Sequence, residues 1–381
     1  MKVLLAHTLK PPTESRIYWK LGSSLSLINN LKVRILGSKG FEEKTQNTAI
    51  EKFGIFDSAA GFWARIFNLF RFWNESRKFK PDVLVMCSPD LLIPAILYKF
   101  CFGSKLIFDV QENFELNIEH QQVYSGFRFY HLVANLYFSI LSPFIDRFWL
   151  AERVYASQLI LPLNRWAVFE NKVPAQWNEP LDTGFEEKPV GAGLIFVFSG
   201  VITIESGVLD AIDFFLVFMA EFPDSKLRIA GYVPSQFLME KLKNIAIQNE
   251  ESIFINIETW QTGRNIHEFI QKADAILVTY KESLANLGKI PTKVYESLFA
   301  GKPVVSSIES HYFSFLNRQK ACIPFNPKGL TRESIIEIHS QIRSYRPLFK
   351  KGKQYIFDEE GLKSDFLALG QNFGSKFRNE D

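Results

Sequence analysis

The sequence is poor in several features that mark particular classes of protein. Its 381 residues include three cysteines, Cys87, Cys101 and Cys322, an odd number without the spacing of a metal site. We therefore expect reduced thiols in a cytoplasmic protein. The formal net charge is only +3, which argues against a nucleic-acid-binding protein because such proteins carry a dense basic stripe.

Signals for a bound cofactor or metal are also missing. The chain contains no Gly-x-Gly-x-x-Gly motif, no Walker-type lysine and no paired carboxylates with metal-ligand spacing. We therefore expect no cofactor and no metal. The apolar start at residues 1–6 is interrupted by His7 and Lys10, which favours a first strand over a signal peptide.

What the chain does have is the composition of a globular protein and a repeated alternation of strand and helix patterns. Apolar residues make up 47% and charged residues 22%. Such alternation predicts parallel sheets covered by helices. The predicted strands are 2–6, 32–36, 81–86, 105–108, 194–198, 226–231, 253–256, 275–278 and one from 304, and the predicted helices are 17–28, 91–100, 207–221 and 265–271.

The length favours two domains. Residues 174–193 are rich in proline and glycine and poor in apolar residues, as expected of a linker. We place an N-terminal Rossmann-like domain at 1–176, a linker at 177–193 and a second Rossmann-like domain at 194–345. A helical, polar segment follows at 346–381.

Aromatic residues are abundant, with 37 phenylalanines. The stretch 62–73 has two interpretations: core packing, or contact with a bilayer surface with Arg65 and Arg71 near the headgroups. The aromatic stretch 127–149 contains several polar residues and a proline, which makes it a poor membrane span. We interpret it as a buried interdomain helix.

One stretch organises the second half. Between the strand at 275–278 and the strand beginning at Val304, residues 291–303 predict a helix that begins at Pro291 and is stopped by Gly301. Its apolar face predicts that Lys293 and Glu296 lie on the opposite edge. The twelve-residue connection 279–290 follows the carboxyl end of a strand, where open α/β sheets bind ligands. A plainer interpretation is that Glu296 complements the helix dipole and pairs with Lys293.

This stretch resembles the donor-site segment of retaining, family-4-type glycosyltransferases of the GT-B fold. The shared pattern is a proline, a lysine two residues later, a glutamate five residues later, and then Ala-Gly-Lys-Pro-Val-Val. The resemblance implies two Rossmann-like parallel-sheet domains facing across a cleft, and a C-terminal segment that returns to the first domain. It also implies that Glu296 accepts hydrogen bonds from the ribose of a nucleotide-sugar.

The chain departs from the family at three donor positions. Val201 and Ser206 stand where the family has an arginine and a lysine that hold the diphosphate, and Gly288 replaces the first glutamate of a pair. Other cations are then needed, and Lys281, Lys289, Lys293 and Arg264 are candidates, although each is also compatible with a solvated surface position. Our candidate donor-binding residues are Glu296, Lys293, Gly200, Arg264 and Tyr280.

The loops after the strands of the first half carry the acceptor side of the resemblance. Lys10 to Arg16 resembles the family's first loop, and Asp109 to Asn113 resembles its Asp-x-His-Glu segment, with Gln111 in place of the histidine. Glutamine cannot take a proton, so the candidate catalytic residues are Glu112 and Asp109. Arg16, Glu14 and Asp90 are the acceptor-side candidates. A helix N-cap at Thr13 or Ser15 and a solvated Glu112 are the plainer alternatives.

The resemblance as a whole implies a metal-independent, hexosyltransferase-type enzyme. It would move a sugar with retention from a nucleotide-diphospho-sugar to a glycan or lipid-linked acceptor in surface polysaccharide biosynthesis. Its expected location is cytoplasmic, with peripheral contact at the inner face of the membrane as an open alternative. Two other functions remain open: a non-catalytic nucleotide-sugar-binding or scaffolding subunit, and a nucleotide-sugar epimerase.

Overall fold

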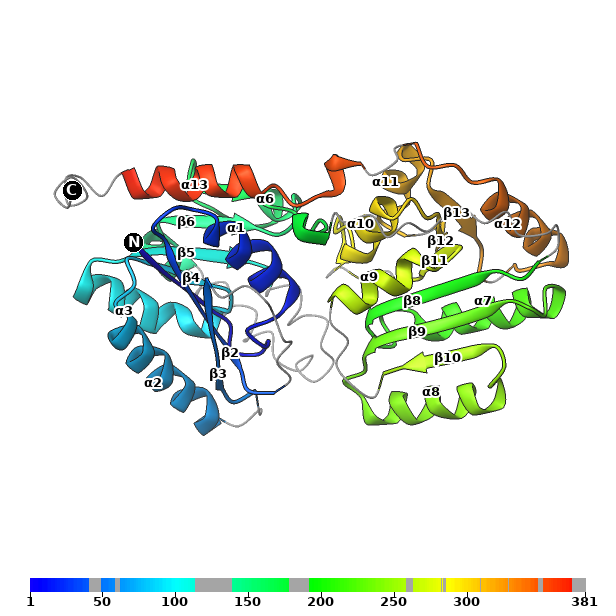
Figure 1. Cartoon of the computed structure of the whole chain (residues 1–381), viewed down its shortest axis with the longest axis horizontal. Helices are drawn as coiled ribbons and strands as arrows, with labels where there is room; N and C mark the ends of the chain where they lie inside the picture. Colours follow the sequence, from blue (N-terminus) through cyan, green and yellow to red (C-terminus); the bar gives the residue numbers. More distant parts are fainter. Residues whose placement is uncertain are drawn as a thin grey trace. The chain divides into compact units, whose positions relative to one another are not determined.

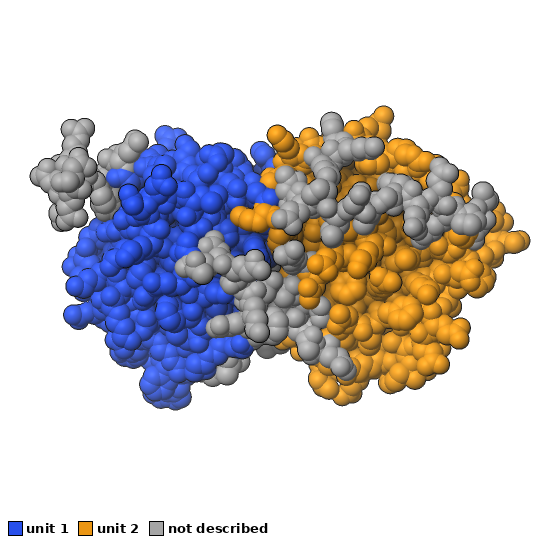
Figure 2. All heavy atoms as spheres, in the orientation of Figure 1, with its two compact units in different colours: residues 1–175, 357–381 blue, residues 176–356 orange. Residues whose placement is uncertain are grey.

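The computed structural model describes most of the chain. The described residues are 1–40, 49–58, 62–113, 139–177, 192–257, 263–281, 283, 286–308, 310–327, 329–348 and 352–371, without the side chains of Phe62, Arg264 and Gln371. The chain divides into two compact units, coloured separately in Figure 2. The first unit comprises Met1–Ala175 and Phe357–Asp381, and the second comprises Gln176–Ile356.

The first unit is built on a parallel sheet of seven strands (Figure 1), in the order β3-β2-β1-β4-β5-β6-β7. In each pair the strands run in the same direction. The strands are β1 (Lys2–Ala6), β2 (Lys32–Ser38), β3 (Ile50–Phe56), β4 (Val83–Met86), β5 (Lys105–Val110), β6 (Arg147–Leu150) and β7 (Trp166–Val168).

Helices cover both faces of this sheet because successive side chains of a strand point to opposite sides. Leu4, Leu84 and Phe108 point to one face, where they join the core that includes residues of α2 (Phe62–Phe79) and α3 (Leu92–Phe102). Val3 and Trp149 point to the other, beneath η1 (Ser15–Gly22, a π-helix), α1 (Ser23–Ser26) and α13 (Glu359–Gln371). The remaining described helices of this unit are short: η2 (Pro89–Leu91), η4 (Ser142–Phe144) and α6 (Tyr155–Gln158).

The C-terminal segment belongs to the first unit. Its α13 packs against α1 (Figure 1), and Asp365 of α13 accepts hydrogen bonds from the Arg147 and Trp149 side chains of β6. The amide of Phe357 donates to the carbonyl of Val173 at 2.7 Å. A chain that enters the second unit at Gln176 therefore finishes on the sheet of the first.

The second unit contains a six-stranded parallel sheet in the order β10-β9-β8-β11-β12-β13. Its strands are β8 (Ile195–Val201), β9 (Lys226–Tyr232), β10 (Ile253–Asn256), β11 (Ala275–Val278), β12 (Val304–Ser307) and β13 (Cys322–Phe325). Its helices are α7 (Val208–Glu221), α8 (Gln236–Gln248), α9 (Gly263–Gln271), α10 (Thr292–Phe299), α11 (Phe313–Arg318) and α12 (Arg332–Ser344), and η5 (Ala175–Trp177) and η7 (Lys353–Tyr355) are single turns. Phe196 and Phe198 of β8 anchor a core with Phe214 and Phe218 of α7.

The strands predicted from the sequence are confirmed, and other elements correct or extend the interpretation. Residues 147–149, the end of the stretch that we assigned to an interdomain helix, belong to strand β6, whose Phe148, Trp149 and Leu150 are fully buried. Residues 114–138 lie outside the described residues. A short apolar run buried on both faces of a sheet has no period that separates it from a helix. The edge strand β3 and helix α8 escaped prediction, and the predicted helix 17–28 is the π-helix η1 followed by one turn of α-helix.

Candidate functional site

Each unit holds a polar cluster where its central strands end. In the first unit, the loop after β1 leads into η1, whose first backbone amides have no partner within the helix. Glu14 caps this helix, because its Oε2 accepts hydrogen bonds from the amides of Arg16 at 2.9 Å and Ile17 at 3.1 Å. The cap considered for Thr13 or Ser15 is therefore supplied by Glu14.

Arg16 and Asp109 meet in the interior of the first unit. The Arg16 guanidinium donates through Nε to Oδ2 of Asp109 at 2.9 Å and through Nη2 to Oδ1 at 2.6 Å. Its Nη1 donates to the carbonyl of Phe169 at 2.8 Å and to Oδ1 of Asn171 at 3.1 Å. The Asp109 side chain is fully buried and that of Arg16 is 2% exposed. Burial lowers the pKa of Arg16, but the Asp109 carboxylate outweighs it, so the pKa is raised and the cation persists.

Gln111 extends this pair toward the loop after β1. Its Nε2 donates to Oδ2 of Asp109 at 2.9 Å, and its Oε1 accepts from Nζ of Lys10 at 2.7 Å. Lys10 also pairs with Oε1 of Glu14 at 3.4 Å. Burial lowers the pKa of Lys10, but Glu14 and Glu112 outweigh it and raise that pKa overall. The residue that replaces the family histidine is thus a fixed link between a buried carboxylate and a lysine.

The remaining acceptor-side candidates surround this network. Glu112 directly follows Gln111 and is exposed. Asp90 is half-buried, and its Oδ1 accepts a hydrogen bond from Oγ1 of Thr8 at 3.1 Å. The structure thus joins Arg16, Asp109 and Glu14 in one network. Glu112 is exposed beside that network, and its charge helps to raise the pKa of Lys10.

In the second unit, Gly200 and Lys293 lie next to each other. Gly200 has φ of +105°, which favours glycine. A Cβ placed on it would lie 3.7 Å from Cε and 3.8 Å from Nζ of Lys293. Gly200 and Val201 remain paired in the sheet and form no turn. The last residues of β8 therefore border the ammonium directly, so an anion lying along this strand end would meet that charge.

Lys293 is a buried cation that lacks an acceptor. Its side chain is 5% exposed, and its Nζ makes no hydrogen bond within the described part of the chain. The ammonium lies 4.5 Å from the ring centroid of Phe198 and 4.7 Å from that of Tyr280. Burial lowers the pKa of Lys293 to about 8, against the opposing effect of Glu296. Within the described residues this ammonium lies against two ring faces and makes no hydrogen bond, so its charge is incompletely compensated, as expected where an anion binds.

Helix α10 carries both Lys293 and Glu296, and its surroundings differ from the prediction. Lys293, Glu296 and Ser297, predicted on an edge away from the core, are all buried, Glu296 being 7% exposed. The spacing of apolar residues identifies the apolar face of the helix, but it does not show which segments pack against the opposite edge. Glu296 is therefore not a solvated surface carboxylate, and within the described residues Lys293 forms no ion pair with it.

The other donor candidates have mixed surroundings. Tyr280 is half-buried, and its pKa is raised by burial and by the neighbouring Tyr312 and Glu296. Lys281 lies 4.0 Å from the carboxylate of Asp210 and is half exposed. The side chain of Arg264 lies outside the described residues. The structure thus brings Gly200, Tyr280, Lys293 and Glu296 together and leaves Lys281 in a surface pair.

Two members of this cluster escaped prediction. Phe198 forms one wall around the Lys293 ammonium, and the hydroxyl of Ser199 is buried without a hydrogen-bond partner in the described residues. Both belong to β8, where an apolar run followed by Ser-Gly predicts only a strand and a turn. Within the described residues no cluster of three or more His, Cys, Asp or Glu side chains is placed to hold a metal ion.

Comparison with known proteins rests on structure, since neither a protein-family model nor a curated protein matches the sequence. Sucrose-phosphate synthase from Thermosynechococcus elongatus aligns with a TM-score of 0.69 at 12% identity, covering 98% of each chain. HepE from Anabaena, in complex with UDP and glucose, aligns with a TM-score of 0.63 at 11% identity over 97% of this chain and 100% of that one.

Two further likenesses show how widely this architecture is used. WaaG, a glycosyltransferase involved in lipopolysaccharide biosynthesis, aligns with a TM-score of 0.60 at 10% identity over 98% of this chain and 95% of that one. A UDP-GlcNAc 2-epimerase from Neisseria meningitidis aligns with a TM-score of 0.54 at 12% identity over 97% of this chain and 100% of that one. At such identities likeness extends to the fold alone. The chain therefore has the GT-B fold, with parallel sheets of seven and six strands.

Proposed function

We propose that the chain is a glycosyltransferase that uses a nucleotide-diphospho-sugar as donor. The observation that carries this proposal is the buried Lys293 ammonium, which borders Gly200 at the end of β8 and has no acceptor within the described residues. A diphosphate would supply that acceptor, and this cation offers the leaving diphosphate electrostatic stabilisation without a metal ion. UDP or UDP-sugars bound to proteins of the same fold, such as HepE, support a nucleotide-sugar donor.

Glu296 is our candidate for the ribose. It lies on the same helix as Lys293, one turn further along, and both side chains are buried. A carboxylate accepts two hydroxyl hydrogens at once, which suits adjacent ribose hydroxyls. The lysine would thus hold the diphosphate while the glutamate holds the sugar of the nucleoside. Transfer to a glycan or lipid-linked acceptor, with retention and of hexosyltransferase type, is the reaction that the resemblance of this segment suggests.

On the acceptor side we assign different roles to the two carboxylates. Both oxygens of Asp109 accept hydrogen bonds, from Arg16 and from Gln111, so Asp109 is a positioning residue that fixes the loop after β5. Glu112, exposed beyond this fixed segment, is the candidate catalytic residue that would act on the acceptor hydroxyl. This division explains how glutamine can replace the family histidine, because Gln111 holds the loop and moves no proton.

A membrane surface is the partner we propose for the first unit. Helix α2 buries Phe72 but exposes Trp63, Phe67 and Phe70, which are spaced along one side of the helix. The same helix also carries the exposed cations Arg65, Arg77 and Lys78. Aromatic and basic side chains on one helix suit an anionic interface. Of the two interpretations of residues 62–73, core packing thus applies to the side of α2 with Phe72, and we propose membrane contact for the side with the exposed aromatic residues.

The neighbouring helix extends this surface. Helix α3 packs beside α2 through Trp73, whose ring centroid lies 5.7 Å from that of Tyr98 (Figure 1). Its exposed side carries Ile93, Leu97 and Phe100. No helix within the described residues is both long and apolar enough to span a bilayer. We propose peripheral attachment at the cytoplasmic face, close to lipid-linked acceptors of surface polysaccharide synthesis, the pathway type of WaaG.

Binding and turnover of nucleotides test the donor proposal. The purified chain would be titrated calorimetrically with UDP, GDP, ADP and dTDP, and then incubated with the corresponding nucleotide-sugars and a membrane extract as acceptor. We expect saturable binding of one nucleotide and release of that nucleotide with sugar transfer. Binding without release would favour the scaffolding subunit, conversion of the donor sugar without transfer would favour an epimerase, and no binding would overturn the proposal.

A further inference from the structure

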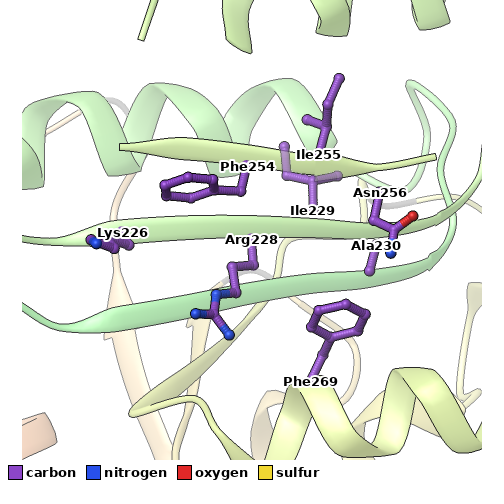
Figure 3. Close-up of a pocket in the computed structure, with 8 residues that line it drawn as sticks. All are labelled: Lys226, Arg228, Ile229, Ala230, Phe254, Ile255, Asn256 and Phe269. Atoms are coloured by element: carbon purple, nitrogen blue, oxygen red, sulfur yellow. The ribbon is translucent and has the colours of Figure 1, made fainter. Parts of the chain in front are cut away.

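A hollow of about 500 Å³ lies in the second unit on the face of the sheet that carries α9, over strands β9 and β10 (Figure 3). Side chains alternate along β9, so Leu227 and Ile229 join the core on the other face while Lys226 and Arg228 border the hollow. Phe254 of β10 pairs in register with Arg228, and Phe269 reaches the hollow from α9. None of the lining residues is acidic; they are Lys226, Arg228, Ile229, Ala230, Phe254, Ile255, Asn256 and Phe269.

The guanidinium of Arg228 is the unexplained group in this hollow. Arg228 is half-buried, and its guanidinium makes no hydrogen bond or ion pair in the described part of the chain. An arginine on the first sheet offers a contrast. Arg34 of β2 is paired with Glu51 at 2.5 Å and Glu75 at 3.6 Å. A half-buried guanidinium with five unused donors is suited to the two oxygens of a carboxylate or phosphate.

The rest of the lining suggests what such an anion is attached to. Phe254 is 43% exposed although it belongs to a strand, and the Lys226 ammonium lies 5.7 Å from its ring centroid. Figure 3 shows the rings of Phe254 and Phe269 on either side of the Arg228 side chain. Aromatic rings flanking a cation provide flat apolar surface beside a charge, which suits a ring with an apolar face that bears an anionic group.

The charged end of the hollow, at Lys226 and Arg228, lies away from the proposed donor site, whereas Ala230 and Asn256 line its other end. Arg228 stands three residues before Gly231, the partner of Gly200 in the sheet, which corresponds to about 10 Å along a strand. The donor candidates lie at the carboxyl ends of the strands, whereas Lys226 is the first residue of β9. A ligand here would therefore leave the Lys293 ammonium free.

We propose that this hollow, which we call the Arg228 site, binds a sugar ring that carries a carboxylate or a phosphate. The guanidinium of Arg228 would donate two hydrogen bonds to the anionic group, and Lys226 would add a second positive charge. The rings of Phe254 and Phe269 would pack against the sugar. In a protein that handles glycans, such a site would hold an acidic sugar unit away from the reacting centre. The proposal stands on the hollow itself and not on the identity of the donor.

Binding measured by NMR or calorimetry in the presence of saturating UDP tests the Arg228 site. The probes are glucose 6-phosphate and glucuronate, with glucose as a ring without charge and inorganic phosphate as a charge without ring. We expect saturable binding of at least one charged sugar, and at least tenfold weaker binding of glucose and phosphate. The preferred charged sugar distinguishes a phosphate from a carboxylate ligand.

Three variants test whether the charged sugar binds at Arg228 and independently of the donor. Arg228→Gln should weaken binding of the charged sugar at least tenfold and leave UDP affinity unchanged, and Phe254→Ala should weaken it several-fold. Glu296→Gln, which alters the proposed donor site, should leave binding of the charged sugar intact. If inorganic phosphate binds as well as glucose 6-phosphate, if Arg228→Gln binds like the wild type, or if UDP displaces the sugar, the Arg228 site as proposed is wrong. Failure of UDP to bind would count against the donor proposal alone.

Discussion

Arg16 and Asp109, 93 residues apart in the chain, form a buried ion pair in which two guanidinium nitrogens donate to two carboxylate oxygens. The pair connects η1 to the end of β5, and through Nη1 it also holds the carbonyl of Phe169 beyond β7. The Arg16 side chain thus joins three segments of the first unit. Such a pair specifies how loops are placed, whereas its contribution to stability depends on both partners being present.

Replacing one partner of this pair should lower the free energy of unfolding more than replacing both partners. We expect Asp109→Asn to lower the free energy of unfolding of the first unit by about 3–5 kcal/mol, because the buried Arg16 cation loses its counter-charge. The double variant Arg16→Met with Asp109→Leu should recover much of that loss. Urea unfolding followed by circular dichroism measures both. Glu221→Gln is the matched control, since its exposed pair with Arg332 should contribute at most about 1 kcal/mol. If Asp109→Asn lowered the free energy of unfolding no more than Glu221→Gln does, this account would be wrong.

The exposed neighbour of this network should behave differently. Glu112→Gln keeps the shape of an exposed side chain, so stability and nucleotide affinity should not change. If Glu112 acts on the acceptor hydroxyl, turnover should fall on the order of 100-fold. Steady-state kinetics with the acceptor varied, together with calorimetry of the donor nucleotide, separate the two effects. Equal losses in donor affinity and turnover would contradict an acceptor-side role, and Glu251→Gln is the surface control.

The aromatic surface of α2 and α3 should govern attachment to lipid. Phe100 is 65% exposed, and its transfer into a bilayer interface contributes up to about 1.5–3 kcal/mol. Phe100→Ser should therefore lower the partition coefficient onto vesicles of anionic phospholipid about tenfold or more. Phe237→Ser is matched, because Phe237 on α8 is 72% exposed but lies in the second unit. Vesicle co-sedimentation decides the matter, and equal binding of the two variants would rule out the surface proposed here.

The sequence predicts the parts of this structure that depend on local patterns. The parallel strands and the β11-α10-β12 unit follow from short apolar runs, Pro291 and Gly301. The unit therefore brings Lys293 and Glu296 together on one helix. The edge strand β3 was missed because its exposed Glu51 and half-buried Lys52 interrupt the apolar pattern. The short strand β6 was missed because it is apolar on both faces.

Long-range partners could not be read from local patterns. Arg16 pairs with Asp109, and Gln111 links Asp109 to Lys10. Both contacts join segments about one hundred residues apart in the chain, so no local pattern predicts them. The burial of Lys293 also depends on Phe198 and Tyr280, which arrive from two other strand ends. Charge and spacing identify candidate residues, whereas the tertiary fold decides which of them are buried, paired or left without an acceptor.

The buried ammonium of Lys293 should give the protein a pH-dependent stability. Burial lowers its pKa from 10.5 to about 8. Between these values the unfolded chain holds the proton and the folded chain does not, so the free energy of unfolding should rise with pH over that range. Below about pH 8 the cost of burying the charge is fully present, and it is on the order of 3 kcal/mol. Lys293→Met should be more stable than the wild type at pH 7 and should lose this difference by about pH 10.5.

The same titration should control binding of an anionic ligand. The phosphates of a nucleoside diphosphate are fully ionised above about pH 7, because their last pKa lies near 6. A fall in affinity between pH 7.5 and 9.5 would then not come from the phosphates. We expect wild-type affinity to decrease through pH 8 as Lys293 loses its proton, and Lys293→Gln to bind weakly without that dependence. Calorimetry at several pH values measures this, and parallel curves for the two proteins would exclude Lys293 as the cation.

Glu296 offers the sharpest test of the donor site, because its carboxylate is buried on the helix that carries Lys293. Two hydrogen bonds from ribose hydroxyls to a carboxylate contribute about 3–6 kcal/mol at most. Desolvation of the carboxylate reduces this, and we expect a net contribution of about 2–4 kcal/mol, which is about 30- to 1000-fold in affinity. Glu296→Gln should therefore weaken nucleotide and nucleotide-sugar alike, and it should weaken a deoxyribose analogue less than the ribose form.

A merely structural Glu296 makes the opposite prediction. If the carboxylate only complements the charge of Lys293 and the dipole of α10, Glu296→Gln should lower stability slightly and leave nucleotide binding unchanged. Calorimetric titration of the folded variant with UDP and deoxy-UDP distinguishes the two cases, with urea unfolding as the check on stability. The difference between the two nucleotides is the decisive quantity, because a general disturbance of α10 would weaken both equally, whereas a lost ribose contact weakens the nucleotide that has both hydroxyls more than the one that lacks a hydroxyl.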